Sequence, residues 1–209
     1  MTLYLIRHGR TNHNVEQLCQ GWTDTELDDL GKKQAGAVAT YFADKELGQI
    51  FASDHKRAQQ TALPTSLLKA IEIQSTELLR ERFLGQLENV PVTALRQAFE
   101  DEIQRTGLSR YEVRPLGCES AQDVMARVTQ FLSLVPRDKG DVAVFTHGMT
   151  KECMLCSLIG ATVESSRSFS FDNASITVLK WSWDVWELQD YNGTGHLATL
   201  SSDPVSVQK

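Results

Sequence analysis

Two short apolar segments of this chain each end in a histidine followed by a glycine. Residues 3–6 lead into Arg7-His8-Gly9, and residues 142–145 lead into Thr146-His147-Gly148 and then a helix-like stretch. A short apolar run bounded by polar residues and glycine is the pattern of a buried strand. Ligands of open α/β sheets bind at the carboxyl ends of the strands. The repeated pattern therefore predicts an α/β sheet with both histidines at its ligand-binding edge.

Two further segments place charged residues at similar positions. Arg57 follows an expected strand over 49–52, and Glu81 follows the segment 77–79. A guanidinium fork binds two phosphate oxygens, while a neutral imidazole can attack phosphorus. Arg7, His8, Arg57, Glu81 and His147 thus predict a site for a phosphorylated substrate.

Ordered motifs along most of the chain resemble the histidine phosphatase superfamily, in its phosphoglycerate-mutase-like branch 1. The matching residues are Leu5-Ile6-Arg7-His8-Gly9-Arg10-Thr11 with Asn14, Gln20-Gly21, Ser53 with Arg57-Ala58, Glu81 to Gly85 with Glu88, Gly117-Cys118-Glu119-Ser120, Thr146-His147-Gly148 and Asn173-Ala174-Ser175. The sequence departs from the family pattern at Arg10, where Glu or Gln is usual. It departs again at Asp54-His55, which replaces a common Pro-Leu pair.

The fold expected from the residues agrees with the fold that the resemblance implies. Strands over 3–6, 49–52, 71–74, 142–145, 176–181 and 185–188 alternate with helices over 31–45, 56–70, 90–105, 119–135 and 151–158. Such alternation favours a mostly parallel sheet covered on both faces. We expect one domain over 1–209, an α/β fold arranged as a three-layer α/β/α sandwich with a helical cap insertion at approximately 84–135. Pro64 should bend or interrupt its helix.

The resemblance implies a role for each matching residue. His8 would attack phosphorus and form a phosphohistidine that water cleaves, and Glu81 would protonate the leaving oxygen. Arg7, Arg57 and His147 would stabilise the transferring phosphoryl group. Asn14, Gln20, Gly21 and Gly148 would bind substrate.

A phosphatase for small phosphomonoesters, a phosphoric monoester hydrolase of the histidine acid phosphatase type, is the preferred interpretation. A cofactor-dependent phosphoglycerate mutase needs extra cations, yet no lysine occurs between Lys69 and Lys139. The mutase stays open as the alternative, with Arg10, Arg82 or Arg96 as the extra cations. A non-catalytic scaffold that binds phosphorylated ligands is a remote alternative. Residues Trp22, Phe83, Leu84 and Leu87 form either an apolar pocket wall or ordinary core.

The charge and composition of the chain restrict the classes of molecule that it is expected to bind. The formal net charge of −6 argues against a nucleic-acid partner, while the local basic cluster still suits a small phosphorylated metabolite. We expect no metal and no cofactor. We also expect a cytoplasmic location without a membrane segment, because no apolar run approaches the length of a membrane span. The oligomeric state stays open. Cys19, Cys118, Cys153 and Cys156 are interpreted as small buried hydrophobic residues. His13, His55 and His196 are interpreted as surface or structural residues.

Overall fold

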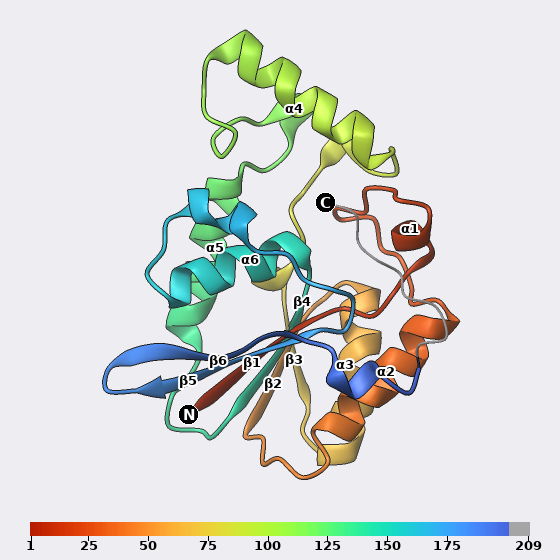
Figure 1. Cartoon of the computed structure of the whole chain (residues 1–209), viewed down its shortest axis with the longest axis vertical. Helices are drawn as coiled ribbons and strands as arrows, with labels where there is room; N and C mark the ends of the chain where they lie inside the picture. The colour runs from red at the N-terminus through yellow and green to blue at the C-terminus, as the bar shows by residue number, and fades with distance from the viewer. Residues whose placement is uncertain (201–209) are drawn as a thin grey trace.

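The computed structural model describes residues 1–200, and six strands within them form one sheet in the order β3-β2-β4-β1-β5-β6 (Figure 1). These strands are β1 (Thr2–Arg7), β2 (Gln49–Ser53), β3 (Ile73–Thr76), β4 (Val142–Thr146), β5 (Ile176–Ser182) and β6 (Val185–Gly193). The strands β1 to β4 run parallel, whereas β5 and β6 are antiparallel to their neighbours. The predicted mostly parallel sheet is confirmed.

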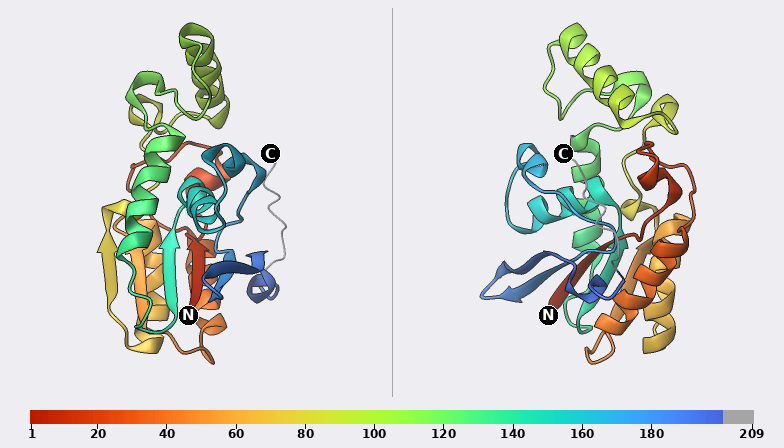
Figure 2. Two further views of the ribbon diagram at one scale, coloured as in Figure 1. Left: turned by 90° about the vertical axis from the view of Figure 1, so that its left-hand side faces the viewer. Right: turned by 45° about the vertical axis from the view of Figure 1, so that its right-hand side comes forward.

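The sheet is the middle of three layers (Figure 2). The helices α2 (Asp29–Tyr41) and α3 (Lys56–Lys69) cover one face, and α5 (Ala121–Leu134) and α6 (Gly148–Leu158) cover the other. The alternation of side chains along β1 serves both layers, because successive residues of a strand point to opposite faces. Leu3 and Leu5 pack with Val124 and Phe131 of α5, whereas Tyr4 packs with residues of α2. The predicted three-layer sandwich is therefore confirmed.

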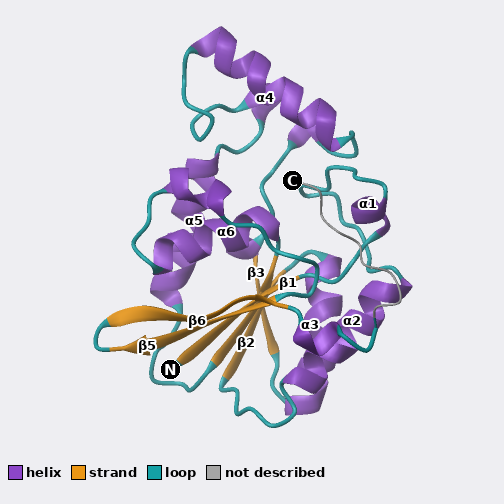
Figure 3. Ribbon diagram, in the orientation of Figure 1, coloured by secondary structure: helices purple, strands orange, loops and turns teal. Residues whose placement is uncertain are grey.

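The helix α4 (Val92–Thr106) lies beyond α5 and α6, at the end of the molecule farthest from the sheet (Figure 3). Its Phe99 packs in a small separate core with Leu84, Leu87 and Val113. Within the range expected for a cap, 84–135, the second half contains α5, which packs on the sheet. The cap as a unit of that extent stays a prediction.

Several local features differ from the sequence-based expectations. The short helix α1 (Asn12–Val15) lies between β1 and α2, where no helix is expected from the sequence, and Thr11 and Asn14 form a reciprocal cap at its start. The helix α3 continues through Pro64, so the expected interruption is wrong; the buried side chains of Ala62 and Thr65 hold the adjacent turns. All four cysteines are buried and free, as interpreted. The short 3-10 helices are η1 (Glu77–Leu79), η2 (Gly85–Leu87), η3 (Pro115–Gly117), η4 (Val163–Ser168) and η5 (Gly195–Leu197).

A helix can cross a membrane only if it is long and apolar enough. Within residues 1–200, each helix is too short or too polar to span a bilayer.

Two glycines of α2 give a matched test of the packing between this helix and the loop after β1. A Cβ built on Gly31 would lie 2.1 Å from the Arg10 carbonyl oxygen, whereas no described atom lies within 4 Å of a Cβ on Gly36. Gly36→Ala should raise the free energy of unfolding by about 0.5–1 kcal/mol, because alanine is the better helix former. Gly31→Ala should lower it by about 1–3 kcal/mol through the backbone clash. Urea denaturation of both variants checks this pair, and a stabilised Gly31→Ala would contradict it.

Candidate functional site

His8 and His147 lie side by side because their strands are parallel neighbours. Arg7, the last residue of β1, stands opposite Thr146 of β4, and the backbone N–H of His8 donates to the Thr146 carbonyl at 2.9 Å. The two imidazole ring centres are 5.3 Å apart. Both side chains are buried, with 2% and 0% exposure. The register of two strands thus brings together histidines that are 139 residues apart.

The proton position on His8 follows from its hydrogen bond. Its Nδ1 lies 2.7 Å from the Gly9 carbonyl oxygen. Because a carbonyl oxygen only accepts hydrogen bonds, Nδ1 carries the proton in this contact. The lone pair of a neutral ring is then on Nε2, the nitrogen that can act as a nucleophile.

Arg57 fixes the proton of His147 in the same way. The Arg57 Nε donates to Nδ1 of His147 at 3.1 Å, so that a neutral ring carries its proton on Nε2. The Nε2 atom is buried, and no residue of the described chain accepts its hydrogen bond. Arg57 itself lies in the first turn of α3 and is fully buried, and it donates to the carbonyls of Gly21 at 2.8 Å and Thr23 at 2.9 Å.

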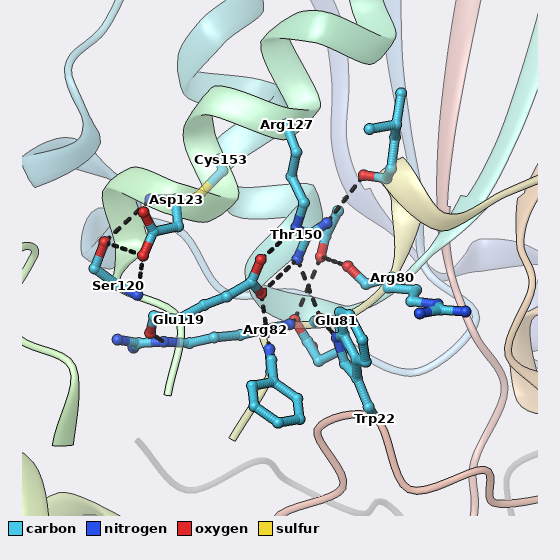
Figure 4. Close-up of polar contacts among 12 residues, drawn as sticks. Trp22, Arg80, Glu81, Arg82, Glu119, Ser120, Asp123, Arg127, Thr150 and Cys153 are labelled. Atoms are coloured by element: carbon cyan, nitrogen blue, oxygen red, sulfur yellow. Dashed lines mark hydrogen bonds and ion pairs between the residues drawn. The ribbon is translucent and has the colours of Figure 1, made fainter. Parts of the chain in front are cut away.

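Glu81 is positioned through its backbone by side chains from three other elements (Figure 4). Its carbonyl accepts hydrogen bonds from the Trp22 indole at 2.8 Å and from Arg127 of α5 at 3.1 Å. Thr150 of α6 donates to the preceding carbonyl, that of Arg80, at 2.7 Å. The carboxylate oxygen Oε2 then accepts from the Met149 N–H at 3.3 Å. A carboxylate there is favoured by the dipole of the helix that begins at Gly148.

Arg7 and Gly148 complete the cluster. Arg7 donates through one terminal nitrogen to the Phe171 carbonyl, while its buried Nε has no partner among residues 1–200. A Cβ built on Gly148 would lie 3.6 Å from Glu81 Oε2 and 3.8 Å from Arg7 Nε, so this glycine adjoins both side chains. Buried donors are normally paired. The Nε–H of Arg7 and the Nε2–H of His147, both unpaired within the described residues, are therefore available to donate hydrogen bonds to an oxyanion.

The three other residues predicted to bind substrate are held by neighbouring side chains. Asn14 accepts hydrogen bonds from Thr11 and, at 3.2 Å, from Asn173, whose amide also donates to the His8 carbonyl at 3.1 Å. The Gln20 side-chain oxygen accepts from the hydroxyl of Thr11 at 3.1 Å. The Gly21 carbonyl accepts a hydrogen bond from Arg57 at 2.8 Å. Their contacts with a substrate stay predictions.

Burial gives the imidazoles and guanidiniums of the cluster different protonation states. Burial lowers the pKa of both His8 and His147 well below the ordinary value for histidine, and the nearby positive charge of Arg57 lowers both further. Burial also lowers the pKa of Arg57, to about 10. At neutral pH the two rings are therefore uncharged while Arg57 keeps its charge.

Sequence reasoning missed the place of His55. It was interpreted as a surface or structural residue, yet it is only 6% exposed, and its ring centre lies 5.3 Å from that of His147. It is the N-cap residue of α3, two residues after the end of β2, at the same edge of the sheet as the cluster. The available signal was the replacement of the Pro-Leu pair by Asp54-His55 in the motif that contains Arg57.

The four residues considered as an apolar pocket wall lie in two different places. The rings of Trp22 and Phe83 are in edge contact, with centres 4.9 Å apart, and both residues are partly exposed beside Glu81. Leu84 and Leu87 instead lie in the small core under α4. For these two leucines, ordinary packing is the correct interpretation.

The chain is similar to known proteins over most of its length. A family model described as "Histidine phosphatase superfamily (branch 1)" matches residues 3–194. A "Putative phosphoserine phosphatase 2" of Hydrogenobacter thermophilus is 32% identical over 201 residues, 95% of this chain and 98% of that protein. A "Probable phosphoglycerate mutase GpmB" of Yersinia pestis is 27% identical over 94% of this chain and 95% of its own length.

Solved structures of similar proteins have the same fold. A mycobacterial glucosyl-3-phosphoglycerate phosphatase in complex with VO3 superposes with a TM-score of 0.80 at 26% identity, over 92% of this chain and 99% of that one. The chain therefore belongs to the histidine phosphatase superfamily, branch 1.

The buried neutral imidazoles should make folding stability depend on pH. Burial lowers the pKa of His8, His55 and His147 below 6.5, and for His55 to about 4. Below about pH 6.5 these three histidines therefore bind more protons in the unfolded chain than in the folded chain, so their contribution to stability is lost as the pH falls. Each histidine should cost about 1.2 kcal/mol between neutrality and about pH 5.5.

Urea denaturation in buffers free of phosphate and sulfate measures this loss. His55→Leu should remove about 1.2 kcal/mol from the difference in the free energy of unfolding between the two pH values, whatever its effect on stability at neutral pH. An unchanged pH difference in the variant would mean that folding does not lower the pKa of His55.

Proposed function

We propose that this protein is a phosphatase that hydrolyses small phosphomonoesters through a phosphohistidine intermediate on His8. It is a phosphoric monoester hydrolase of the histidine acid phosphatase type, with Glu81 as the proton donor. The observation that carries the proposal is the proton arrangement of the two imidazoles: His8 offers the lone pair of Nε2, whereas His147 offers the proton on its Nε2. One ring is thus set as a nucleophile and its neighbour as a donor to a phosphoryl oxygen.

The reaction has two displacements at phosphorus. In the first, the Nε2 lone pair of His8 forms a P–N bond while the ester P–O bond breaks, and Glu81 gives a proton to the leaving oxygen. In the second, water attacks phosphorus, Glu81 takes a proton from it and the P–N bond breaks. Arg7, Arg57 and His147 bind the phosphoryl oxygens in both steps, because phosphoryl transfer depends mainly on positioning and charge stabilisation.

Of the cations considered for a mutase, Arg10 is paired with a carboxylate and Arg82 is turned toward α4, which supports hydrolysis. Arg10 pairs with Asp28 through a contact of 2.7 Å. Arg82 donates to the Glu119 carbonyl at 2.6 Å and stacks over Phe99 of α4, pointing away from Arg80 and Trp22 (Figure 4). Arg96 is exposed on α4. A second anionic group of a bisphosphate would therefore gain little from these side chains.

The names of related proteins support a small phosphorylated metabolite as the substrate. They include phosphoserine, glucosyl-3-phosphoglycerate and α-ribazole phosphatases. The shared chemistry is a phosphomonoester on a small polar alcohol. A screen of phosphate release over sugar phosphates, phosphoglycerates, nucleotides and phosphoamino acids identifies the substrate.

His8→Ala tests the covalent mechanism. The variant should lose at least about a thousandfold in kcat, because no neighbouring group replaces the nucleophile. Rapid quench of the wild-type enzyme with labelled substrate should trap an adduct on His8 that is labile in acid and stable in base. Phosphate release by His8→Ala near the wild-type rate would exclude the phosphohistidine.

Phosphoglycerate separates the phosphatase from the mutase in the same assays. Wild-type enzyme given 3-phosphoglycerate with a trace of the bisphosphate should yield phosphate and glycerate. Faster conversion to 2-phosphoglycerate would establish the mutase instead. Tight phosphate binding without either reaction would favour the non-catalytic scaffold. EDTA should leave the rate unchanged, since Arg7 and Arg57 supply the positive charge.

Glu81→Gln tests the proton donor. With an alkyl phosphate the variant should lose about a hundredfold or more in kcat, because the leaving alkoxide needs a proton. With p-nitrophenyl phosphate the loss should be less than about tenfold in the phosphorylation step, since that leaving group is stable as an anion. Equal losses with both substrates would argue against the acid role.

A further inference from the structure

His55 forms a row of three imidazoles with the histidines of the cluster. The ring centre of His147 lies 5.3 Å from that of His8 and 5.3 Å from that of His55. On its other side His55 faces Trp22, at 6.4 Å between ring centres. The Nδ1 atom of His55 is buried and has no hydrogen-bond partner within residues 1–200. A leucine, the residue usual at this position of the motif, would fill the space without leaving a polar atom unsatisfied.

The carboxylates around His55 are already paired with cations. On its own turn, Asp54 accepts three contacts from Arg80, the closest at 2.5 Å. Asp24, on the loop that carries Trp22, accepts from the backbone N–H of Lys56 at 2.7 Å, and its other oxygen lies 3.8 Å from the Lys56 ammonium. The charged and titratable groups that act on His55 or respond to it are Asp24, Asp54, Arg57, Arg80, His8 and His147.

This environment keeps His55 neutral when the site holds no anion. Burial lowers its pKa to about 4, with a further lowering from Arg57, and Asp54 only partly opposes this. A phosphoryl dianion on Arg57 and His147 would bring two negative charges beside the same ring. Opposite charge favours the charged form of histidine.

We propose that His55 is a third histidine of the anion site, and that it takes up a proton when a tetrahedral dianion binds. The inference rests on the proposed function, because it places the phosphoryl group on Arg57 and His147. The proton gives the site a positive charge that the usual leucine cannot provide, and only while the dianion is present.

The sign of the pH dependence follows from linkage. The pKa of His55 is higher in the complex than in the free protein, so binding takes up a proton and affinity rises as the pH falls through the pKa of the complex. The increase is complete below the pKa of the free protein, about 4. Each unit by which the dianion raises the pKa adds tenfold to the affinity.

Sulfate is the probe, because it remains a dianion at all pH values used. Isothermal titration calorimetry at about pH 5.5 and about pH 7, in buffers of different ionisation enthalpy, gives both the affinity and the number of protons taken up. The variants are His55→Leu, which supplies the usual residue, and His55→Asn, which keeps a polar group near the Nδ1 position without titrating. His196→Gln is the matched control; the His196 ring contacts the Ala174 carbonyl at 3.1 Å.

The wild-type protein and His196→Gln should take up more protons with sulfate than either His55 variant. The increase in sulfate affinity between the two pH values should be up to about tenfold larger with His55 than without it. In ¹⁵N spectra at the lower pH, both ring nitrogens of His55 should move to imidazolium positions when sulfate is added. Equal proton uptake in the wild type and both His55 variants overturns the inference, and so does a loss of affinity that is the same at both pH values.

The same titrations distinguish a failure of the proposed function. If sulfate does not bind the wild-type protein, or if Arg57→Ala binds it equally well, the anion site itself is wrong. If sulfate binds through Arg57 and the His55 variants keep the wild-type proton uptake, only the role of His55 is wrong.

Discussion

The buried guanidinium of Arg57 is the interaction on which the rest of the site depends. A buried charge is tolerated only when hydrogen bonds replace its hydration. Arg57 obtains them from His147 and from the carbonyls of Gly21 and Thr23. Glu88 in turn holds that loop, accepting from the Trp22 N–H and the Thr23 hydroxyl at 2.9 Å each. One charge thus joins the loop after α1, the start of α3 and the end of β4, and it fixes the ring of His147.

The same burial has opposite chemical results for arginine and for histidine. Removing water lowers the pKa of both types of cation, but arginine starts far above neutrality and histidine starts just below it. Arg57 therefore keeps its proton, whereas His8 and His147 lose theirs. The site needs a fixed positive charge and an uncharged nucleophile at the same pH. Burial away from water provides both, because it leaves Arg57 charged and His8 neutral.

The sheet and most of the cluster were predictable from the sequence because they follow from local patterns. Apolar runs gave the strands, and residues at strand ends meet at one edge of a parallel sheet. The position of His55 was not predictable in this way, since its burial depends on Trp22 and His147, which lie far from it in the sequence. Leu84 and Leu87 were ambiguous for a similar reason: only α4 shows which surface covers them. The helix through Pro64 depends on tertiary packing that outweighs a local preference.

The chain carries more acidic than basic residues, yet its site gathers cations, so selectivity depends on which basic groups remain available. Arg10 and Arg80 face carboxylates of Asp28 and Asp54, and each pair leaves little charge for a ligand. Arg7 and Arg57 use mainly backbone carbonyls as partners, which hold the guanidinium in place without cancelling its charge. The type of partner therefore separates the arginines that hold the fold together from those that can bind a phosphoryl group. Arg82 also meets this criterion, because it donates to the Glu119 carbonyl, but its guanidinium lies over the Phe99 ring and points away from Trp22 (Figure 4). The positive charge that Arg7 and Arg57 bring to the site therefore suits one phosphate.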